Sequence, residues 1–384
     1  MNDVKTALIL GGGVGGIVAA NRLRKLLPTR HRVVLVDRQR QHLFQPSLLW
    51  LAVGDRTASD IQRPLDRLVP KGVEVRIGSI DRIDAATRTV RVGGQDIRGD
   101  AIIVALGADL APETMPGLAE SGHNLYTLSG ASAFEHALRT LTGGRIVVLT
   151  AAPAYKCPAA PYEAAMLIES ALRHRGLQDR VHVDLYAAES GPMAVTGPKL
   201  SGQVREVVES RGIAYYPEHQ VTRVDATARR LEFSNGVTAE FDLLLYVPPH
   251  RAPGVVREAG LLAPTGWMAA DRHTFATAVN GIYAIGDVTG IPLAMGKPLP
   301  KAGVFAHAQA EVVAENIASI WAGRDARRTF DGVGQCFVET GDGRAGFGAG
   351  NFYAEPTPQV TFHAPARRWH WGKVLFERRW LWHW

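Results

Sequence analysis

A run of glycines that follows a short apolar segment constrains this chain more than any other feature. Residues 7–10 read Ala-Leu-Ile-Leu, residues 11–16 read Gly-Gly-Gly-Val-Gly-Gly, and residues 17–27 carry apolar side chains at helical spacing. A buried strand, a glycine loop and a helix in this order are typical of the βαβ unit that binds a dinucleotide. The sequence therefore predicts such a unit at the start of the chain.

The glycines of this run have separate physical tasks in such a unit. Gly11 permits the tight turn, Gly13 lets the backbone approach a pyrophosphate, and Gly16 allows the helix to pack closely on the strand. The N-terminus of the helix presents free N–H groups to the anion. Residues 32–36 supply a second apolar strand, and Asp37 at its end can accept hydrogen bonds from an adenosine ribose.

Length and composition limit the class of protein further. The chain has 384 residues, 46% of them hydrophobic, which is enough for two or three domains with their own cores. The formal charge of +6 is small for this length and no basic run accompanies a nucleic-acid motif, so nucleic-acid binding is not expected. No apolar run reaches membrane-spanning length, and the first strand begins too close to Met1 for a signal peptide to be expected.

A second βαβ pattern begins at Arg145 and lacks its glycines. Residues 146–150 and 181–187 read as strands and residues 162–173 as the helix between them, whereas residues 151–161 read Ala-Ala-Pro-Ala-Tyr-Lys-Cys-Pro-Ala-Ala-Pro. Side chains and prolines in this loop obstruct close approach of the backbone to a pyrophosphate. The sequence therefore predicts a dinucleotide fold that has lost its dinucleotide, although Glu189 after the second strand leaves weak NAD(P)H binding open.

The two cysteines of the chain, Cys157 and Cys336, are far apart in sequence. They exclude a disulfide scaffold and a four-cysteine metal site, and no metal is expected. Cys157 follows Lys156 and stands near the expected start of a helix, and both features lower the pKa of a thiol. A small buried apolar side chain is the commoner role of a single cysteine, but the proline-rich setting favours a reactive one.

Two later segments return the chain to the first domain. Residues 100–106 form an apolar strand that ends in Ala105-Leu106-Gly107, and residues 281–285 form another that ends in Gly286-Asp287. A glycine at such a strand end admits a cofactor, and the aspartate can bind a ribityl hydroxyl. A helix then opens at Pro300-Lys301-Ala302-Gly303, where its dipole can stabilise negative charge on a reduced flavin.

Together these motifs resemble the flavoprotein disulfide reductase superfamily with two dinucleotide domains. Within it, residues 152–163, 246–250, 300–303 and 336–339 resemble the sulfide:quinone oxidoreductases and the flavoprotein subunit of flavocytochrome c sulfide dehydrogenase. The resemblance implies an α/β fold with tandem Rossmann-like FAD and NAD(P)-like domains and a C-terminal amphipathic, membrane-associating segment. The implied parts are the FAD domain in residues 1–108 and 251–330, a second Rossmann-like domain with a degenerate NAD site in residues 109–250, and a quinone and membrane region in residues 331–384.

The same resemblance implies a site built around FAD, whose covalent or non-covalent attachment it leaves open. Hydrosulfide would attack a bridge between Cys157 and Cys336, and the released thiolate would donate to the flavin. Some relatives carry a third active-site cysteine, which this chain lacks. The implied catalytic residues are Cys157, Cys336, Glu163 and Lys301. The implied FAD-binding residues are Gly11, Gly13, Val14, Gly15, Gly16, Asp37, Arg38, Gln45, Pro46, Ile80, Ala105, Gly107, Gly286, Asp287, Lys301 and Ala302. The aromatic residues expected at the quinone are Phe347, Phe352 and Tyr353.

Three functions remain open at this stage. The favoured one is a peripheral membrane enzyme that passes electrons from sulfide through FAD to a quinone. The alternatives are the flavoprotein subunit of a flavocytochrome and a type II NADH:quinone dehydrogenase-like flavoprotein. Glu163 and Lys301 can handle protons or form structural ion pairs, and His42, His250 and His307 are weaker acid–base candidates because a lone histidine is more often structural.

The C-terminal segment, residues 367–384, holds five of the eight tryptophans. As a helix it places an apolar group on one side and basic residues on the others. The apolar group is Trp371, Val374, Leu375 and Trp382, and the basic residues are Arg368, Lys373 and Arg379. Tryptophan favours the headgroup boundary and basic residues favour anionic lipids, which predicts peripheral attachment to an inner or cytoplasmic membrane and a segment dispensable for FAD binding. Docking on the chain itself or on a second copy in a homo-oligomer is the alternative.

Overall fold

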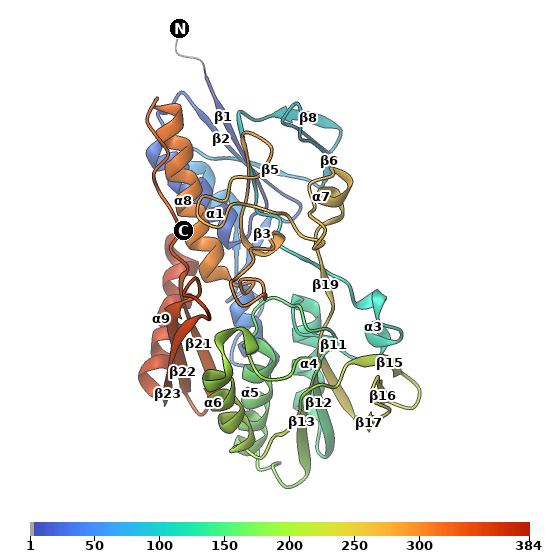
Figure 1. Cartoon of the computed structure of the whole chain (residues 1–384). Coiled ribbons are helices and arrows are strands. Elements are labelled where there is room, and N and C mark those ends of the chain that lie inside the picture. The colour runs from blue at the N-terminus through green and yellow to red at the C-terminus, as the bar shows by residue number, and fades with distance from the viewer. Residues whose placement is uncertain (1–3) are drawn as a thin grey trace.

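Two five-stranded parallel sheets lie one beyond the other in the computed structural model, which describes residues 4–384 (Figure 1). The strands of the first sheet, in spatial order, are β20 (Ile282–Ala284), β9 (Ala101–Val104), β1 (Thr6–Leu10), β2 (Arg32–Asp37) and β5 (Glu74–Ile77). Every residue of β1 and β9 is buried, as strands covered on both faces of a parallel sheet require. The helices α1 (Val14–Leu26) and α8 (Gly303–Trp321) pack against each other on this sheet.

The second sheet repeats this architecture with shorter edge strands. Its strands, in spatial order, are β11 (His123–Asn124), β18 (Leu243–Val247), β12 (Gly144–Thr150), β13 (Val181–Ala187) and β14 (Ala214–Tyr216). Its helices are α4 (Leu128–Thr140), α5 (Ala160–His174) and α6 (Pro198–Glu209). The chain crosses between the two sheets twice, and the crossing segments β10 (Asp109–Leu110) and β19 (His250–Arg251) pair with each other. Tandem Rossmann-like domains are therefore confirmed.

Smaller elements decorate the two sheets. Antiparallel sheets are formed by β6 (Ile80–Asp84), β7 (Thr89–Val92) and β8 (Gln95–Arg98), by β15 (Val221–Asp225), β16 (Arg230–Phe233) and β17 (Thr238–Glu240), and by β3 (Gln41–Leu43) and β4 (Gln62–Pro64). Short α-helices are α2 (Leu48–Ala52), α3 (Leu118–Ser121) and α7 (Gly254–Glu258). Single turns of 3₁₀ helix occur at Gln45–Ser47, Pro112–Thr114, Ala194–Thr196 and Gly286–Val288, with a longer one at Leu65–Lys71.

The C-terminal region forms a third unit that lies along both domains. Its strands β21 (Val333–Gly341), β22 (Arg344–Asn351) and β23 (Gln359–Ala366) make an antiparallel sheet, and α9 (Arg367–His383) follows directly. In Figure 1 this unit, drawn in red, runs beside α8 of the first domain and beside α5 and α6 of the second. β21 packs on α5, so residues near position 336 are brought to the helix that follows residue 157.

One face of α9 is held on the chain by buried polar contacts. Arg56 donates to both carboxylate oxygens of Glu377, at 2.8 to 3.1 Å, and Ser47 donates to the same carboxylate at 2.5 Å. Glu377 is only 3% exposed, and a buried carboxylate without these partners would be strongly destabilising. The helix therefore docks on its own protein, which the sequence left as the alternative.

This docking changes which side chains of α9 face outward. Trp371, Leu375 and Trp382 are 63 to 69% exposed, whereas Val374 and Lys373 are buried. The expectations that Val374 joins the outward apolar face and that Lys373 extends toward lipid are therefore wrong. In residues 4–384, no helix combines the length and the apolar character that crossing a bilayer demands.

Candidate functional site

The loop between β1 and α1 has the shape that a pyrophosphate needs. Gly11 has φ of +108°, and a Cβ there would lie 2.4 Å from the carbonyl oxygen of Ala105. A Cβ on Gly16 would lie 1.8 Å from the carbonyl oxygen of Gly11, so the helix can approach only a glycine. A Cβ on Gly13 would meet nothing within 4 Å, and no side chain caps the helix. The loop is thus closed toward the protein and open toward a ligand, and it fits a dinucleotide.

The other motifs of the first domain converge on this loop. Ala306 of α8 lies against both Gly15 and Gly286, at 3.5 and 3.2 Å from the Cβ that each glycine lacks. Gly286 donates its N–H to Gln309 at 2.7 Å, and Gln309 is fully buried on α8. Gln309 is a residue that sequence reasoning missed, since a glutamine within a helix carries no motif. Gly107 follows β9 by three residues, has φ of +69°, and a Cβ there would meet nothing within 4 Å.

The remaining predicted cofactor residues lie along the same domain in varied settings. Asp37 accepts from the N–H of Gly12 at 2.5 Å and from that of Gln39 at 2.6 Å, so it braces the glycine loop. Arg38 and Gln45 are exposed, whereas Val14, Pro46, Ile80 and Ala302 are half-buried. Their contacts with FAD stay predictions.

His42 links the glycine loop to α9. Its Nδ1–H donates to the carbonyl of Gly12 at 3.0 Å, and its Nε2 accepts from the indole of Trp380 at 2.9 Å. Burial lowers the pKa of His42 to about 4, so the ring is neutral at physiological pH. With both nitrogens engaged, His42 braces the structure, and the C-terminal helix supports the cofactor loop. This link speaks against the expectation that residues 367–384 are dispensable for FAD binding.

Lys301 is held by backbone carbonyls rather than by a carboxylate side chain. Its ammonium donates to the carbonyls of Asp287 and Thr289, each at 2.7 Å, and lies 3.4 Å from the ring centroid of Trp267. Burial lowers the pKa of Lys301 to about 8, against an opposing effect of Asp287. Together with Gly286 and Ala302 it lines a small cleft, where a cation can face the cofactor.

The cysteine loop is tied to this same segment. The N–H of Cys157 donates to the carbonyl of Lys301 at 2.7 Å, and Tyr126 donates its hydroxyl to the carbonyl of Lys156 at 2.6 Å. Cys157 has φ of +51°, in the left-handed region that costs a residue with a Cβ about 1 kcal/mol. These bonds hold that conformation, and they fix Cys157 beside the residues that line the cleft.

Cys336 reaches the same place from β21. It pairs with Gly348 in the antiparallel sheet, and both cysteines are half-buried free thiols that pack on the core of the second domain. Because β21 packs on α5, which begins just after Cys157, the two cysteines lie on neighbouring segments of that core. The structure thus brings together two residues that lie far apart in sequence.

A buried ion pair stands beside the two cysteines. Lys373 of α9 donates to Glu163 of α5 at 2.6 Å, and the same carboxylate oxygen accepts the N–H of Glu339 at 2.8 Å. Glu163 and Lys373 are 2% and 6% exposed. Glu339, also buried, pairs with His370 at 3.0 Å. Lys373, Glu339 and His370 were missed as site residues, because only the packing of β21 on α5 and the docking of α9 bring them to Glu163 and to each other.

Both thiols are harder to ionise than a free cysteine. Burial raises the pKa of Cys157 to about 12, with Glu163 adding to the rise and Lys373 opposing it. Burial also raises the pKa of Cys336, and charge on Cys157 and Glu163 raises it further. The expectation of a pKa lowered by Lys156 and the helix N-terminus is wrong, because burial outweighs the helix and Lys156 is itself buried over the ring of Tyr126.

The loop that replaced the second glycine motif is tied to Glu189 by a hydrogen bond. Glu189 accepts hydrogen bonds from Tyr155, from Tyr162 at 2.7 Å and from Thr150 at 2.9 Å. Tyr155 belongs to the loop that replaced the glycines, and it is buried. A carboxylate engaged by three hydroxyls has little capacity left for a ribose, so the geometry does not favour the NAD(P)H alternative.

The other two histidines are less suited to acid–base chemistry. Burial first and then the charge of Lys156 lower the pKa of His250 to about 3, and its Nδ1 lies 2.8 Å from the carbonyl oxygen of Pro248. His307 lies on α8, 3.9 Å from Glu311 and beside the indole of Trp380. Neither donates to or accepts from either cysteine.

The three aromatics expected at a quinone do not gather. Phe347 stacks on Trp369 with 4.6 Å between ring centroids, and it lies beside Phe337 on β21. Phe352 and Tyr353 instead enter the core of the first domain, where Phe305, Phe330 and Arg272 surround them. Phe352 and Tyr353 thus lie apart from Phe347, because β22 ends at Asn351 and the chain turns inward, and contact of any of the three with a quinone stays a prediction.

Comparisons with known proteins support the fold described above. A family model described as pyridine nucleotide-disulphide oxidoreductase matches residues 5–310. The sulfide-quinone reductase of Aquifex aeolicus (strain VF5) is 28% identical and aligns over 98% of this chain and 90% of that protein. The mitochondrial sulfide:quinone oxidoreductase of Dictyostelium discoideum is 24% identical over 88% of this chain and 76% of that protein. The X-ray structure of the Aquifex aeolicus sulfide:quinone oxidoreductase superimposes with a TM-score of 0.89 at 26% identity, covering 99% of this chain and 91% of that one.

The raised thiol pKa predicts how alkylation depends on pH. Because the pKa of Cys157 lies near 12 instead of 9.0, its thiolate fraction below pH 9 is roughly a thousandth of that of a free thiol. Iodoacetamide should therefore label Cys157 at a rate that rises about tenfold per pH unit from 7 to 10. Glu163→Gln should speed labelling several-fold, since it removes a negative charge that raises the pKa.

Peptide-resolved mass spectrometry of the reduced protein measures these rates. Glu206→Gln, an exposed glutamate on α6, is the matched control and should leave them unchanged. A labelling rate that levels off below pH 9, or slower labelling in Glu163→Gln, would contradict the assigned electrostatics.

Proposed function

The chain belongs to the pyridine nucleotide-disulphide oxidoreductase family, and we propose that it is an FAD-dependent enzyme that oxidises sulfide and passes the electrons to a quinone. The observation that carries the proposal is the packing of β21, which bears Cys336, on α5, which follows Cys157 and holds the Glu163–Lys373 ion pair. The near full-length similarity to proteins named as sulfide-quinone reductases supports it. A flavocytochrome subunit would use the same pair with a haem partner, and it remains the second candidate by resemblance only.

FAD fits the open edge of the first domain. The loop at Gly13 and the N-terminus of α1 would hold its pyrophosphate, while Gly286, Asp287 and Ala302 would line the path toward the cysteines. Bound there, FAD supplies a two-electron acceptor that can pass electrons on to a quinone. Lys301, with a cation fixed by two carbonyls, is placed to favour negative charge on that group.

The cysteine pair performs the sulfur chemistry. Hydrosulfide attacks one sulfur of the bridged Cys157–Cys336 pair, a bond forms between the sulfide sulfur and that cysteine, and the other cysteine leaves as a thiolate. Transfer of the persulfide sulfur to a second hydrosulfide or another thiolate frees both cysteines. Re-forming the bridge then releases two electrons, which the bound cofactor accepts. Two electrons leave for each sulfide sulfur oxidised.

Lys373 is placed to stabilise the thiolate that leaves in this cycle. A leaving thiolate is costly in a site where burial raises the pKa of both cysteines. Lys373 opposes that rise at both sulfurs, and Glu163 keeps the lysine charged by a 2.6 Å ion pair. The ion pair therefore places a cation beside the leaving thiolate. When the cysteines are bridged and no thiolate is present, Glu163 balances the charge of Lys373.

The outward face of α9 is proposed to lie on a membrane. Trp371, Leu375 and Trp382 point away from the protein, and Phe376 is 47% exposed. The exposed basic residues of this helix are Arg367, Arg368, Arg378 and Arg379. Aromatic residues with arginines favour the interface of an inner or cytoplasmic membrane. The stacked Phe347 and Trp369 lie where α9 begins, close to the strand of Cys336, and offer a surface to a quinone.

Anaerobic mixing tests the function directly. Sulfide should bleach the visible band of the bound flavin, and NADH should not, since the second loop lacks its glycines and Tyr155 already occupies the carboxylate of Glu189. Cys157→Ser and Cys336→Ser should each lower sulfide-dependent bleaching by about a hundredfold or more while retaining FAD. Rapid bleaching by NADH without a response to sulfide would overturn the assignment.

Substitutions on α9 test the membrane surface. Trp371→Ser with Trp382→Ser should reduce sedimentation with anionic liposomes by about tenfold or more, because both indoles are exposed and would enter the interface. Sulfide bleaching should be unchanged, since neither residue faces the site. Val69→Ser with Val237→Ser, which alters exposed apolar residues elsewhere, is the control. Equal sedimentation of the intact protein and the tryptophan variant would refute the membrane assignment.

A further inference from the structure

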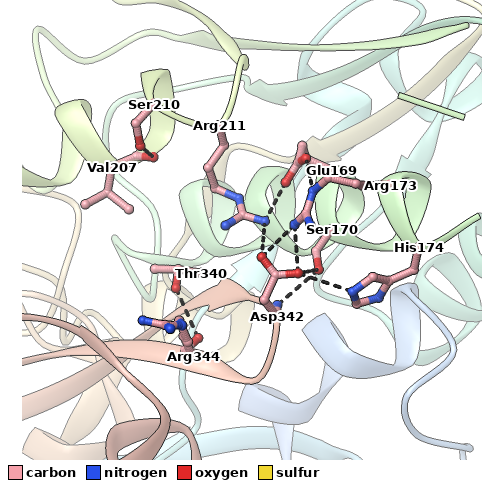
Figure 2. Close-up of polar contacts among 10 residues, drawn as sticks. All are labelled: Glu169, Ser170, Arg173, His174, Val207, Ser210, Arg211, Thr340, Asp342 and Arg344. Atoms are coloured by element: carbon pink, nitrogen blue, oxygen red, sulfur yellow. Dashed lines mark hydrogen bonds and ion pairs between the residues drawn. The ribbon is translucent and has the colours of Figure 1, made fainter. Parts of the chain in front are cut away.

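Asp342 stands at the centre of an ion-pair cluster that joins the C-terminal sheet to the second domain. It lies in the turn between β21 and β22, and Figure 2 shows side chains from α5 and the end of α6 pointing at it. Arg173 donates to both of its oxygens at 2.7 and 2.6 Å, and Arg211 donates at 3.1 Å. Ser170 donates its hydroxyl at 3.1 Å and accepts the N–H of Asp342 at 3.1 Å.

The cluster is closely packed, and its arginines stabilise the ionised form of Asp342. A Cβ on the neighbouring Gly341 would lie 2.5 Å from the Cβ of Ser170, so the turn lies directly on α5. Burial alone would raise the pKa of Asp342, but hydrogen bonds from Arg173 and Arg211 outweigh it and hold that pKa at about 2. Bidentate pairing with arginine also fixes the direction of the carboxylate. The sulfide chemistry described above makes no use of this cluster.

Asp342 is the second of two points that fix β21 along α5. The first is the bond from the N–H of Glu339 to Glu163. From Glu163 to Ser170 the helix rises about 10 Å, at 1.5 Å per residue. From Glu339 the strand continues for two residues to Gly341, at about 3.3 Å per residue, and Asp342 follows in the turn. These two contacts, at Glu163 and at Ser170, hold β21 and its turn alongside the same helix.

Followed in the other direction, β21 and α5 lead to the cysteines. Cys336 stands three residues before Glu339 on β21, and Cys157 stands just before the start of α5. An axial shift of β21 on α5 would move one sulfur past the other. Hydrogen bonds within the C-terminal sheet do not prevent such a shift, because they join β21 to β22 and not to α5.

We propose that Asp342, through Arg173, Arg211 and Ser170, is a positioning residue that sets the register of Cys336 against Cys157 and thereby favours the bridged form of the pair. The inference rests on the proposed role of the cysteines as a redox pair. It follows from effective concentration: two thiols held in contact form a bridge more readily than two that slide past each other. Weakening the cluster should make the bridge easier to reduce.

The test measures the thiol–disulfide equilibrium of the FAD-loaded protein. The protein is equilibrated without oxygen in graded mixtures of reduced and oxidised glutathione, which exchange two electrons and two protons with the pair, then acid-quenched, alkylated and analysed by mass spectrometry. Asp342→Asn keeps the shape of the side chain and tolerates the left-handed backbone at φ of +57°. It should lower the equilibrium constant for the bridge by about tenfold, or about 30 mV for a two-electron couple.

Further variants separate positioning from general stability. Asp96→Asn removes another arginine-paired carboxylate, on the strand β8 of the first domain, and should leave the equilibrium unchanged. Asp342→Glu keeps the carboxylate, so its equilibrium constant for the bridge should lie between those of the unaltered protein and Asp342→Asn. If Asp342→Asn fails to fold, Arg173→Gln provides the same test at a more exposed position.

The outcomes distinguish the positioning role of Asp342 from the redox role of the cysteine pair. A bridge in the unaltered protein with the same equilibrium constant in Asp342→Asn and Arg173→Gln would overturn the positioning role and leave the proposed function intact. Absence of any bridge in the unaltered protein, at every glutathione ratio, would overturn both. A shift in the Asp342 variants but not in Asp96→Asn is the result expected from a register clamp.

Discussion

The ion pair between Glu163 and Lys373 is the interaction on which the site depends. It joins three segments: α5 directly after the cysteine loop, the C-terminal helix α9, and through the N–H of Glu339 the strand that carries Cys336. Removing one partner of such a buried pair typically costs about 3 to 5 kcal/mol, because the other charge stays behind without compensation. The site and the docking of α9 are therefore one structural unit.

The docking of α9 gives this helix one face toward the protein and one face toward the outside. Its inner face carries Lys373, Glu377 and Trp380, which reach α5, Arg56 and His42. Its outer face carries the exposed tryptophans and arginines. Because the inner contacts are polar and specific, they fix the rotation of the helix about its axis and thus determine which aromatic residues face outward. The same contacts connect that surface to the cofactor loop through His42 and Gly12.

The parts of this arrangement that follow local chemistry could be predicted from sequence. The glycine loop at residues 11–16, its loss at residues 151–161 and the return at Gly286 each have a backbone requirement that the sequence displays. The rotation of α9 could not be predicted, since Lys373 is drawn inward by Glu163, some 210 positions earlier in the chain. The prediction of a lowered pKa for Cys157 is wrong for a related reason. The neighbours of Cys157 in the sequence favour a thiolate, but burial by distant segments raises the pKa of its thiol.

Trapping the sulfur on the protein tests the central claim that the cysteine pair carries the reaction. The oxidised, FAD-loaded protein is mixed with one equivalent of sulfide, quenched with an alkylating agent and digested, and the peptides with Cys157 and Cys336 are analysed by mass spectrometry. One cysteine should bear a single added sulfur atom, and the other should be alkylated as a free thiol. Reduction of the flavin with no added sulfur on either peptide, and with the bridge intact, would contradict it.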